Sequence, residues 1–190
     1  MNTAQSLKIK AVGDICPGDK AIMGAGVCSL MKKHGCEFPL SLIQEKLSGA
    51  DILIGNLEGI MSQAVNEISA LELPFCGLPA FAKSLKRAGF TVLNVANNHI
   101  LEHGAEIFNE TMALLQNTGL QVCGLRDEGK FYSRPVTITK NGMKVGIIGY
   151  NWVGKDKFPD ADKYIAQSHD SVVNYTWTRN HVYDQQARAQ

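Results

Sequence analysis

The sequence predicts an α/β fold with a largely parallel central sheet, and two observations carry this prediction. Short apolar runs of strand length alternate along the chain with amphipathic segments of helical spacing. Several of the apolar runs end abruptly in polar residues, as strands do at the ligand-binding edge of open parallel sheets. Because right-handed crossovers keep such strands parallel, we expect their polar ends to share one edge of the sheet.

The first half of the chain supplies two predicted strands. Residues 7–12 alternate apolar and basic side chains before Gly13 and Asp14, which indicates a first strand that ends at an acidic residue. Residues 39–47 suit a short helix. Residues 50–55 form a second compact apolar run, and Asn56 follows it directly. Both predicted strands are therefore followed by a polar side chain.

Two amphipathic helices flank the next predicted strand. Residues 79–88 carry apolar side chains at three- and four-residue spacing with basic residues opposite, and Gly89 fits the C-cap. Residues 92–96 resemble a buried parallel strand. Residues 107–115 repeat the helical spacing, and Gly119 closes that helix. This stretch therefore predicts a helix, a strand and a second helix in that order.

A short strand and a hairpin are expected to complete the sheet region. Residues 120–124 favour the strand. Residues 134–139 and 143–149 are two β-rich runs joined by Asn141-Gly142, a dipeptide typical of tight hairpin turns. The hairpin adds an antiparallel portion to the predicted fold.

The regular pattern is lost after residue 151. Residues 155–162 are charged and loop-like, while residues 171–190 look helical but show no cap and no following strand. We therefore expect residues 1–190 to form a single, incomplete domain whose motif-bearing part is 7–151, with 152–190 supplying a loop and a partial helix.

Composition excludes several classes of protein. Nineteen Lys and Arg residues balance 18 Asp and Glu residues, so no long-range field favours nucleic acid or an anionic membrane. The five cysteines are odd in number and lack paired C-x-x-C spacing, which favours a reducing compartment over a structural zinc site. No signal peptide or apolar run of membrane-spanning length is seen. The chain as given is expected to be cytoplasmic.

Three predicted strand ends deliver the candidate site. They supply Asp14, then Asn56 with Glu58, and then Asn98 with His99. Carboxylate, amide and imidazole groups together suit a divalent cation. The sequence therefore predicts a metal site at the shared edge of the sheet.

Each candidate residue also has a structural explanation. Asp14 could serve a turn, Glu58 could be a solvated loop carboxylate, and Asn98 could cap the next helix. His99 could be a histidine bonded to a backbone carbonyl, and Cys16 could be a small apolar loop residue rather than a soft ligand. Convergence of the strand ends is what favours function over these alternatives.

A competing motif overlaps the candidate site. His99, Glu102 and His103 spell H-x-x-E-H, the inverted zinc-peptidase signature. That chemistry needs both histidines on one helical face, with the glutamate as base. Gly104 and the preceding asparagines disfavour a regular helix through these residues, so a zinc peptidase stays an alternative hypothesis.

Three motifs in register resemble the bacterial capsule synthesis family (CapA, poly-γ-glutamate biosynthesis). They are Gly13-Asp14, Gly55-Asn56-Leu57-Glu58, and Ala96-Asn97-Asn98-His99 followed by Gly104. The resemblance runs from about residue 7 to residue 151. The family's later motifs, His-Trp-Gly and Gly-His-x-x-His, are not found, so the resemblance implies that the carboxyl-terminal part is missing.

That family is similar to the calcineurin-like metallophosphoesterases, which pack two sheets between outer helices in four α/β/β/α layers. The likeness implies two divalent ions of manganese, iron or zinc, and His99 beside the scissile phosphate. It implies metal ligation by Asp14 and Asn98, with Glu58 or Asn56 bridging, and it implies that Asn97 and Glu102 lie behind these groups and orient them. Cys16 stands where the phosphoesterases carry a histidine ligand.

The resemblance also implies substrates and partners. A small molecule or polymer, such as a phosphoester, is the expected substrate, and capsule-assembly proteins at the cell envelope are expected partners. A different implication is a non-catalytic component of a polymer assembly or export complex, which the amide at Asn56 and the thiol at Cys16 favour. This chain alone is expected to hold metal weakly and to show little activity.

Overall fold

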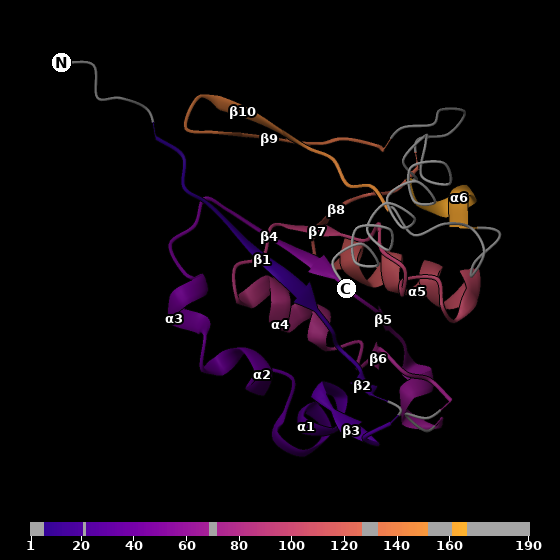
Figure 1. The fold of residues 1–190 in the computed structure, drawn as a ribbon. Helices are drawn as coiled ribbons and strands as arrows, with labels where there is room; N and C mark the ends of the chain where they lie inside the picture. Colours follow the sequence, from indigo (N-terminus) through magenta and orange to yellow (C-terminus); the bar gives the residue numbers. More distant parts are fainter. Residues whose placement is uncertain (1–5, 21, 69–71, 127–132, 152–160, 167–190) are drawn as a thin grey trace, which may run out of the picture.

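The centre of the molecule is a sheet of four parallel strands. The computed structural model describes residues 6–20, 22–68, 72–126, 133–151 and 161–166. The strands β1 (Ile9–Ile15), β4 (Ile52–Leu57), β7 (Val92–Asn94) and β8 (Gln121–Cys123) lie side by side in the order β1-β4-β7-β8. This arrangement confirms the predicted α/β class with a parallel central sheet (Figure 1).

The connections between these strands carry the helices. The longer ones are α1 (Val27–His34), α4 (Phe81–Arg87) and α5 (Gly104–Asn117), and the four-residue ones are α2 (Phe38–Ser41), α3 (Gln44–Leu47) and α6 (Ala161–Tyr164). A 3₁₀ turn, η1, spans Gln63–Asn66. Short strand pairs complete the connections: β2 (Asp19–Lys20) with β3 (Ala25–Gly26), and β5 (Ile60–Met61) with β6 (Cys76–Gly77).

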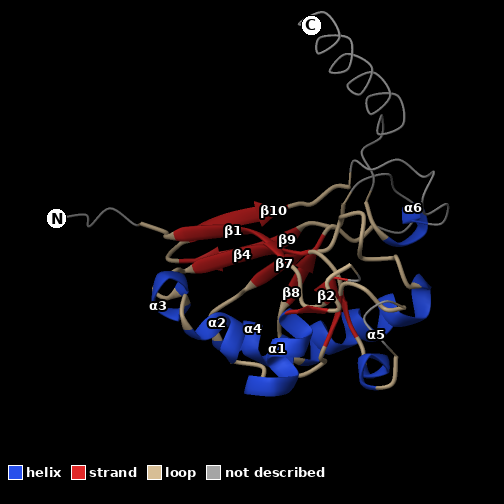
Figure 2. Cartoon of the chain, turned by 60° about the horizontal axis from the view of Figure 1, so that its bottom comes forward, coloured by secondary structure: helices blue, strands red, loops and turns tan. Residues whose placement is uncertain are grey.

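The two faces of the parallel sheet are covered differently. Helices α1 to α5 gather on one face, and the hairpin of β9 (Val136–Lys140) and β10 (Met143–Ile147) lies on the other (Figures 1 and 2). The larger apolar core fills the helical side and includes Leu53, Leu57 and Leu93. A smaller cluster packs Val92 and Cys123 against Val136. The β9–β10 hairpin is therefore a second, two-stranded sheet packed on the face of the parallel sheet opposite the helices, and the family resemblance implied a second sheet.

Helix α4 shows why its sequence adopts this position. Its buried side chains include Phe81, Ala82 and Leu85, which recur at helical spacing and face the core. Full burial of a side chain such as Phe81 or Leu85 contributes ~1.5–3 kcal/mol. Gly89 follows the C-cap with a φ of 101°, so the chain can turn back into β7. Both this helix and its closing glycine were predicted.

The predicted hairpin is confirmed. Strands β9 and β10 pair antiparallel, with Met143 opposite Lys140. Asn141 and Gly142 between them have φ values of 51° and 73°, the two positive values that a type I′ turn requires. The Asn-Gly dipeptide therefore identified the turn correctly.

Four predicted elements need correction. The helix expected over 39–47 is two four-residue helices, α2 and α3. The strand expected over 92–96 ends at Asn94. Asp14 was expected to end the first strand and Asn56 to follow the second, but both lie inside their strands, β1 and β4. A register shift between Ala11 and Asp14 lets β1 continue to pair with β4 beyond the predicted end.

The remaining predictions concern the end of the chain and membranes. Residues 161 and 162, expected in a loop, lie in α6. The loop predicted over 155–160 and the helical segment predicted over 171–190 lie outside the described residues. No helix in the described ranges combines the length and apolar character needed to cross a bilayer.

Candidate functional site

A row of polar side chains crosses three strands at the carboxyl end of the sheet. Asp14 on β1 is paired in register with Asn56 on β4, which is paired in turn with Asn94 on β7. The Asn56 Nδ2 donates to Asp14 Oδ1 at 2.6 Å, and the Asn94 Nδ2 donates to Asn56 Oδ1 at 2.8 Å. We call these three residues the polar row. Its hydrogen bonds assign which way both amides face.

Asn97 ties the polar row to the loop that follows β7. Its buried Nδ2 donates to the Leu57 carbonyl at 2.8 Å and to Asn56 Oδ1 at 3.3 Å. Its Oδ1 accepts from the backbone N–H groups of His99 and Ile100, both at 3.1 Å. One side chain thus sets the path of the backbone that carries His99.

Glycines allow the loops to approach Asn94. A Cβ added at Gly149 would lie 1.9 Å from Asn94 Oδ1, and one added at Gly124 would lie 2.8 Å from the same atom. Gly124 also has a φ of 94°. Only a residue without a side chain fits at these two points, so the backbone of both loops packs directly against Asn94.

His99 lies between two carboxylates beside the polar row. Its Nδ1 is 2.8 Å from Glu102 Oε2, and its Nε2 is 4.0 Å from Glu58 Oε1. The three side chains are between 17% and 25% exposed, so solvent reaches them only partly. An ionised carboxylate only accepts, so the bond to Glu102 places a proton on Nδ1. This leaves Nε2 as the ring atom that faces the site.

The predicted site residues thus largely come together. Asp14 contacts Asn56, and Glu58 lies near His99. Asn98 is half-buried in the loop between Asn97 and His99, and no described residue exchanges a hydrogen bond with its side chain. Asn97, Asn98 and His99 follow the end of β7, as predicted.

Sequence reasoning missed two residues of the site. Asn94 completes the polar row but stands inside an apolar run, where it reads as a strand residue. Phe75 stacks on His99, with ring centroids 4.1 Å apart and an angle of 28° between the rings. Asn94 could have been found because it lies two residues after Val92, and alternate residues of a strand point to the same face of the sheet. The contact between Phe75 and His99 joins residues far apart in the sequence, so no local sequence pattern predicts it.

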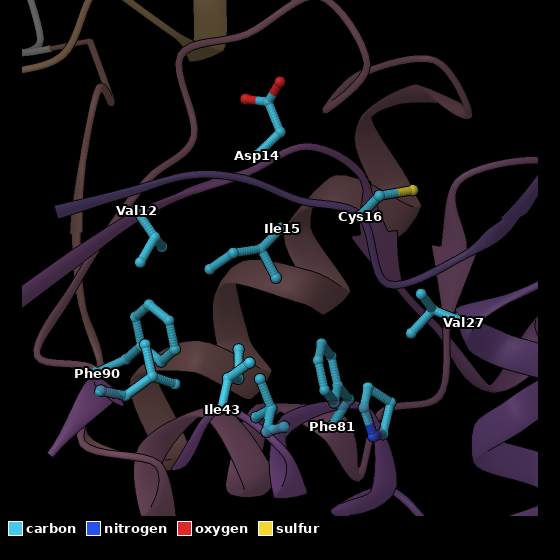
Figure 3. Close-up of a pocket in the computed structure, with 11 residues that line it drawn as sticks. Val12, Asp14, Ile15, Cys16, Val27, Ile43, Phe81 and Phe90 are labelled. Carbon is cyan, nitrogen blue, oxygen red and sulfur yellow. The ribbon is translucent and has the colours of Figure 1, made fainter. Parts of the chain in front are cut away.

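An apolar cavity lies on the opposite side of β1 from the polar row. It has a volume of about 240 Å³, and its lining includes Val12, Ile15, Phe81 and Phe90. Figure 3 shows Val12 and Ile15 pointing into this space while the Asp14 carboxylate points away from it. The cavity therefore belongs to the packing between β1 and the helices rather than to the polar site.

The peptidase hypothesis lacks the geometry it needs. Helix α5 begins at Gly104, so His99 and His103 precede it and share no helical face. Glu102 binds His99 directly, and His103 Nε2 lies 2.7 Å from the Pro74 carbonyl oxygen. Each histidine therefore has its own protein partner.

The described residues do not gather a complete metal site by themselves. Within the described ranges, no group of three or more histidine, cysteine, aspartate or glutamate side chains is arranged to hold an ion. Burial raises the pKa of the Cys16 thiol, and the charge of Glu58 raises it further. In the protein without metal, this thiol therefore holds its proton more tightly than a free cysteine does.

Comparison with known proteins agrees with the motifs. The model of the family described as bacterial capsule synthesis protein PGA_cap matches residues 8–190. A capsule biosynthesis protein CapA of Bacillus anthracis is 27% identical over 149 residues, 77% of this chain and 35% of that protein. A PGA biosynthesis protein CapA of Bacillus subtilis is 25% identical over 154 residues, 80% of this chain and 39% of that protein.

The extent of the family match decides the assignment. It covers nearly the whole chain and includes the polar row, the Glu58 loop and the Asn97-Asn98-His99 loop. The chain spans less than half the length of the two CapA relatives. On this match, the chain belongs to the bacterial capsule synthesis protein (PGA_cap) family.

Proposed function

We propose that this chain forms part of a protein that acts in capsule or poly-γ-glutamate synthesis, and that its sheet edge carries a phosphoesterase-type hydrolytic site. The hydrolytic site is proposed from the contacts of the His99 ring with two carboxylates. Glu102 holds one ring nitrogen, and the other faces Glu58 at 4.0 Å beside the polar row. The names of the two CapA relatives support the biological part.

In this proposal His99 transfers a proton. With the Nδ1 proton engaged by Glu102, the neutral ring takes a proton from an attacking water at Nε2, and the imidazolium so formed can give that proton to the oxygen of the leaving group. Glu102 fixes the ring orientation as well as the tautomer. Glu58 is placed to orient a polar group, such as a water, next to Nε2. General acid–base assistance of this kind contributes ~10²–10⁴-fold to a rate.

A divalent metal is a separate part of the proposal. Asp14, Glu58, Asn98 and His99 carry suitable donor atoms near the carboxyl edge of the sheet, but the described residues form no cluster of three histidine, cysteine, aspartate or glutamate ligands. We therefore propose two ions of manganese, iron or zinc only for a protein that supplies further ligands. Asn56 has its amide oxygen engaged by two amide donors, so it acts here by orienting Asp14.

The test compares single variants of the full-length protein that contains this chain. His99→Ala should reduce hydrolysis of a chromogenic phosphodiester such as bis-p-nitrophenyl phosphate by ~10²-fold or more, while metal content measured by elemental analysis changes little. His34→Ala is the matched control, because His34 is exposed at the end of α1 and stacks on Phe38. An unchanged rate in His99→Ala would remove the proposed role of His99.

One observation favours a second candidate function. The two amides of the polar row and the neutral Cys16 thiol give this edge few charged ligands, which suits a non-catalytic component of a polymer assembly or export complex. Elemental analysis and the phosphodiester assay together separate the two functions. Bound metal with turnover that depends on His99 supports the hydrolase, whereas a full-length protein without metal or turnover supports the assembly role.

A further inference from the structure

The backbone of Phe75 has an unusual conformation next to His99. Among the described residues other than glycine, only Phe75 and Asn141 have φ in the left-handed region, at 60° and 51°. Asn141 occupies a hairpin turn, where asparagine is common. Phenylalanine has no polar side-chain group to offset the steric conflict of this region, so its surroundings must impose the conformation.

Two neighbouring segments hold the Phe75 backbone from opposite sides. Its N–H donates to the Asp19 carbonyl at 3.3 Å, and its carbonyl accepts from the Ile60 N–H at 3.1 Å. Both segments approach through glycine: a Cβ added at Gly18 or at Gly59 would lie 2.3 Å from Phe75 backbone atoms. The contact between these backbones therefore depends on two residues that lack side chains.

A third contact ties the same loop to the segment that carries His99. The Pro74 carbonyl can only accept, so His103 Nε2 donates to it across 2.7 Å. His103 is the residue immediately before α5, and it follows His99 by four positions. The loop before Phe75 and the loop after β7 are thus joined at both His99 and His103.

These contacts place the Phe75 ring against one face of the His99 imidazole. The two rings stack at 4.1 Å and 28°, and both side chains are half-buried. The stack covers one face of the imidazole, while Glu102 binds one edge and Glu58 lies off the other. The stack and the bond to Glu102 together constrain the plane of the imidazole.

We propose that Phe75 is a positioning residue: its ring, held by a strained backbone, fixes the plane of the His99 imidazole so that Nε2 points toward Glu58. The proposal deepens the hydrolytic function and rests on it for its catalytic consequence. Its structural content does not depend on activity, because ring stacking is observable in the protein without substrate.

Nuclear magnetic resonance of the 190-residue chain tests the stack directly. A close aromatic face shifts the imidazole proton signals of His99, and these protons should show contacts to the Phe75 ring in the parental chain. Phe75→Leu should lose the shift, and Phe75→Tyr should keep it. Phe38→Leu is the matched control, since Phe38 stacks on His34 at 4.6 Å and 28°, and it should alter His34 alone.

Several outcomes would overturn the proposal. They are an absence of ring-to-ring contacts in the parental chain, or His99 signals that stay in place in a folded Phe75→Leu variant. If that variant fails to fold, the parental contacts and the comparison of Phe75→Tyr with Phe75→Met decide the question: a shift kept by tyrosine and lost by methionine supports the stack, and a shift that both keep refutes it.

Kinetics of the full-length protein test the catalytic consequence. Phe75→Leu should lower kcat by ~10- to 100-fold with KM nearly unchanged, because misorientation of a proton-transfer group affects the transition state more than binding. Phe75→Tyr should restore kcat. If His99→Ala leaves turnover intact, the proposed function fails while the resonance data still decide the stack. If His99→Ala abolishes turnover but Phe75→Leu does not lower it, the positioning role fails.

Discussion

Replacement of Asn97 by alanine should destabilise the whole molecule. The change would leave the Leu57 carbonyl and the N–H groups of His99 and Ile100 without their side-chain partner, while Asn56 would keep its bond from Asn94. Three lost bonds at ~1 kcal/mol each lower the free energy of unfolding by about 3 kcal/mol. This is a large part of the ~5–15 kcal/mol typical of a domain.

Thermal and urea unfolding monitored by circular dichroism measure this loss. For a chain of this length, a 3 kcal/mol loss lowers Tm by ~6–12 °C. Asn109→Ala is the control, because Asn109 is exposed in the middle of α5 and alanine suits a helix at least as well. If Asn97→Ala unfolds within ~0.5 kcal/mol of Asn109→Ala, the Asn97 bonds do not hold the loop and the reasoning is refuted.

Four further predictions concern metal, the thiol of Cys76 and packing. The 190-residue chain alone should retain well under one equivalent of manganese, iron or zinc after gel filtration, and stoichiometric metal by elemental analysis would contradict the incomplete ligand set. Burial raises the pKa of Cys76 to about 12 from an ordinary value of 9.0, so its thiol should resist iodoacetamide at pH 8.5 in the folded chain and react after unfolding in urea. Because the folded state binds this proton more tightly, the stability it contributes is complete below pH 9 and is lost as the pH rises toward 12. The urea midpoint of the parental chain should therefore fall over this range relative to that of Cys76→Ser. A difference between the two midpoints that stays constant from pH 9 to 12 would contradict the sign. Gly149→Ala should cost ~1–3 kcal/mol by pushing against Asn94, whereas Gly146→Ala, with open space at its Cβ, should be nearly neutral in the same unfolding assay.

Local signals explain which parts of the fold were predictable. The Asn141-Gly142 turn and the spacing of helices α4 and α5 depend on neighbouring residues, so the sequence was enough to identify them. The end of β1 depends on pairing with β4, and the shift at Asp14 follows from that register rather than from nearby residues. The division of 39–47 into two helices reflects contacts with α1 and the core, which periodicity does not reveal.

The candidate site was predictable to the same extent. The strand ends pointed to Asp14, Asn56 and His99 because a parallel sheet brings its carboxyl ends to one edge. The partners that orient them were harder to find: Asn94 was hidden in an apolar run, and Phe75 acts through a stack and a backbone conformation that arise only after folding.

The polar row also sets the charge that a visiting molecule meets at this edge. Amides neither gain nor lose protons between acid and base, so of the row's three members only Asp14 carries a formal charge. Three carboxylates at the same positions would repel one another and any anion. With Asn56 and Asn94 as neutral dipoles, the row itself opposes a negatively charged ligand with one like charge instead of three, so the remaining negative charge of this edge comes from Glu58 and Glu102 beside His99.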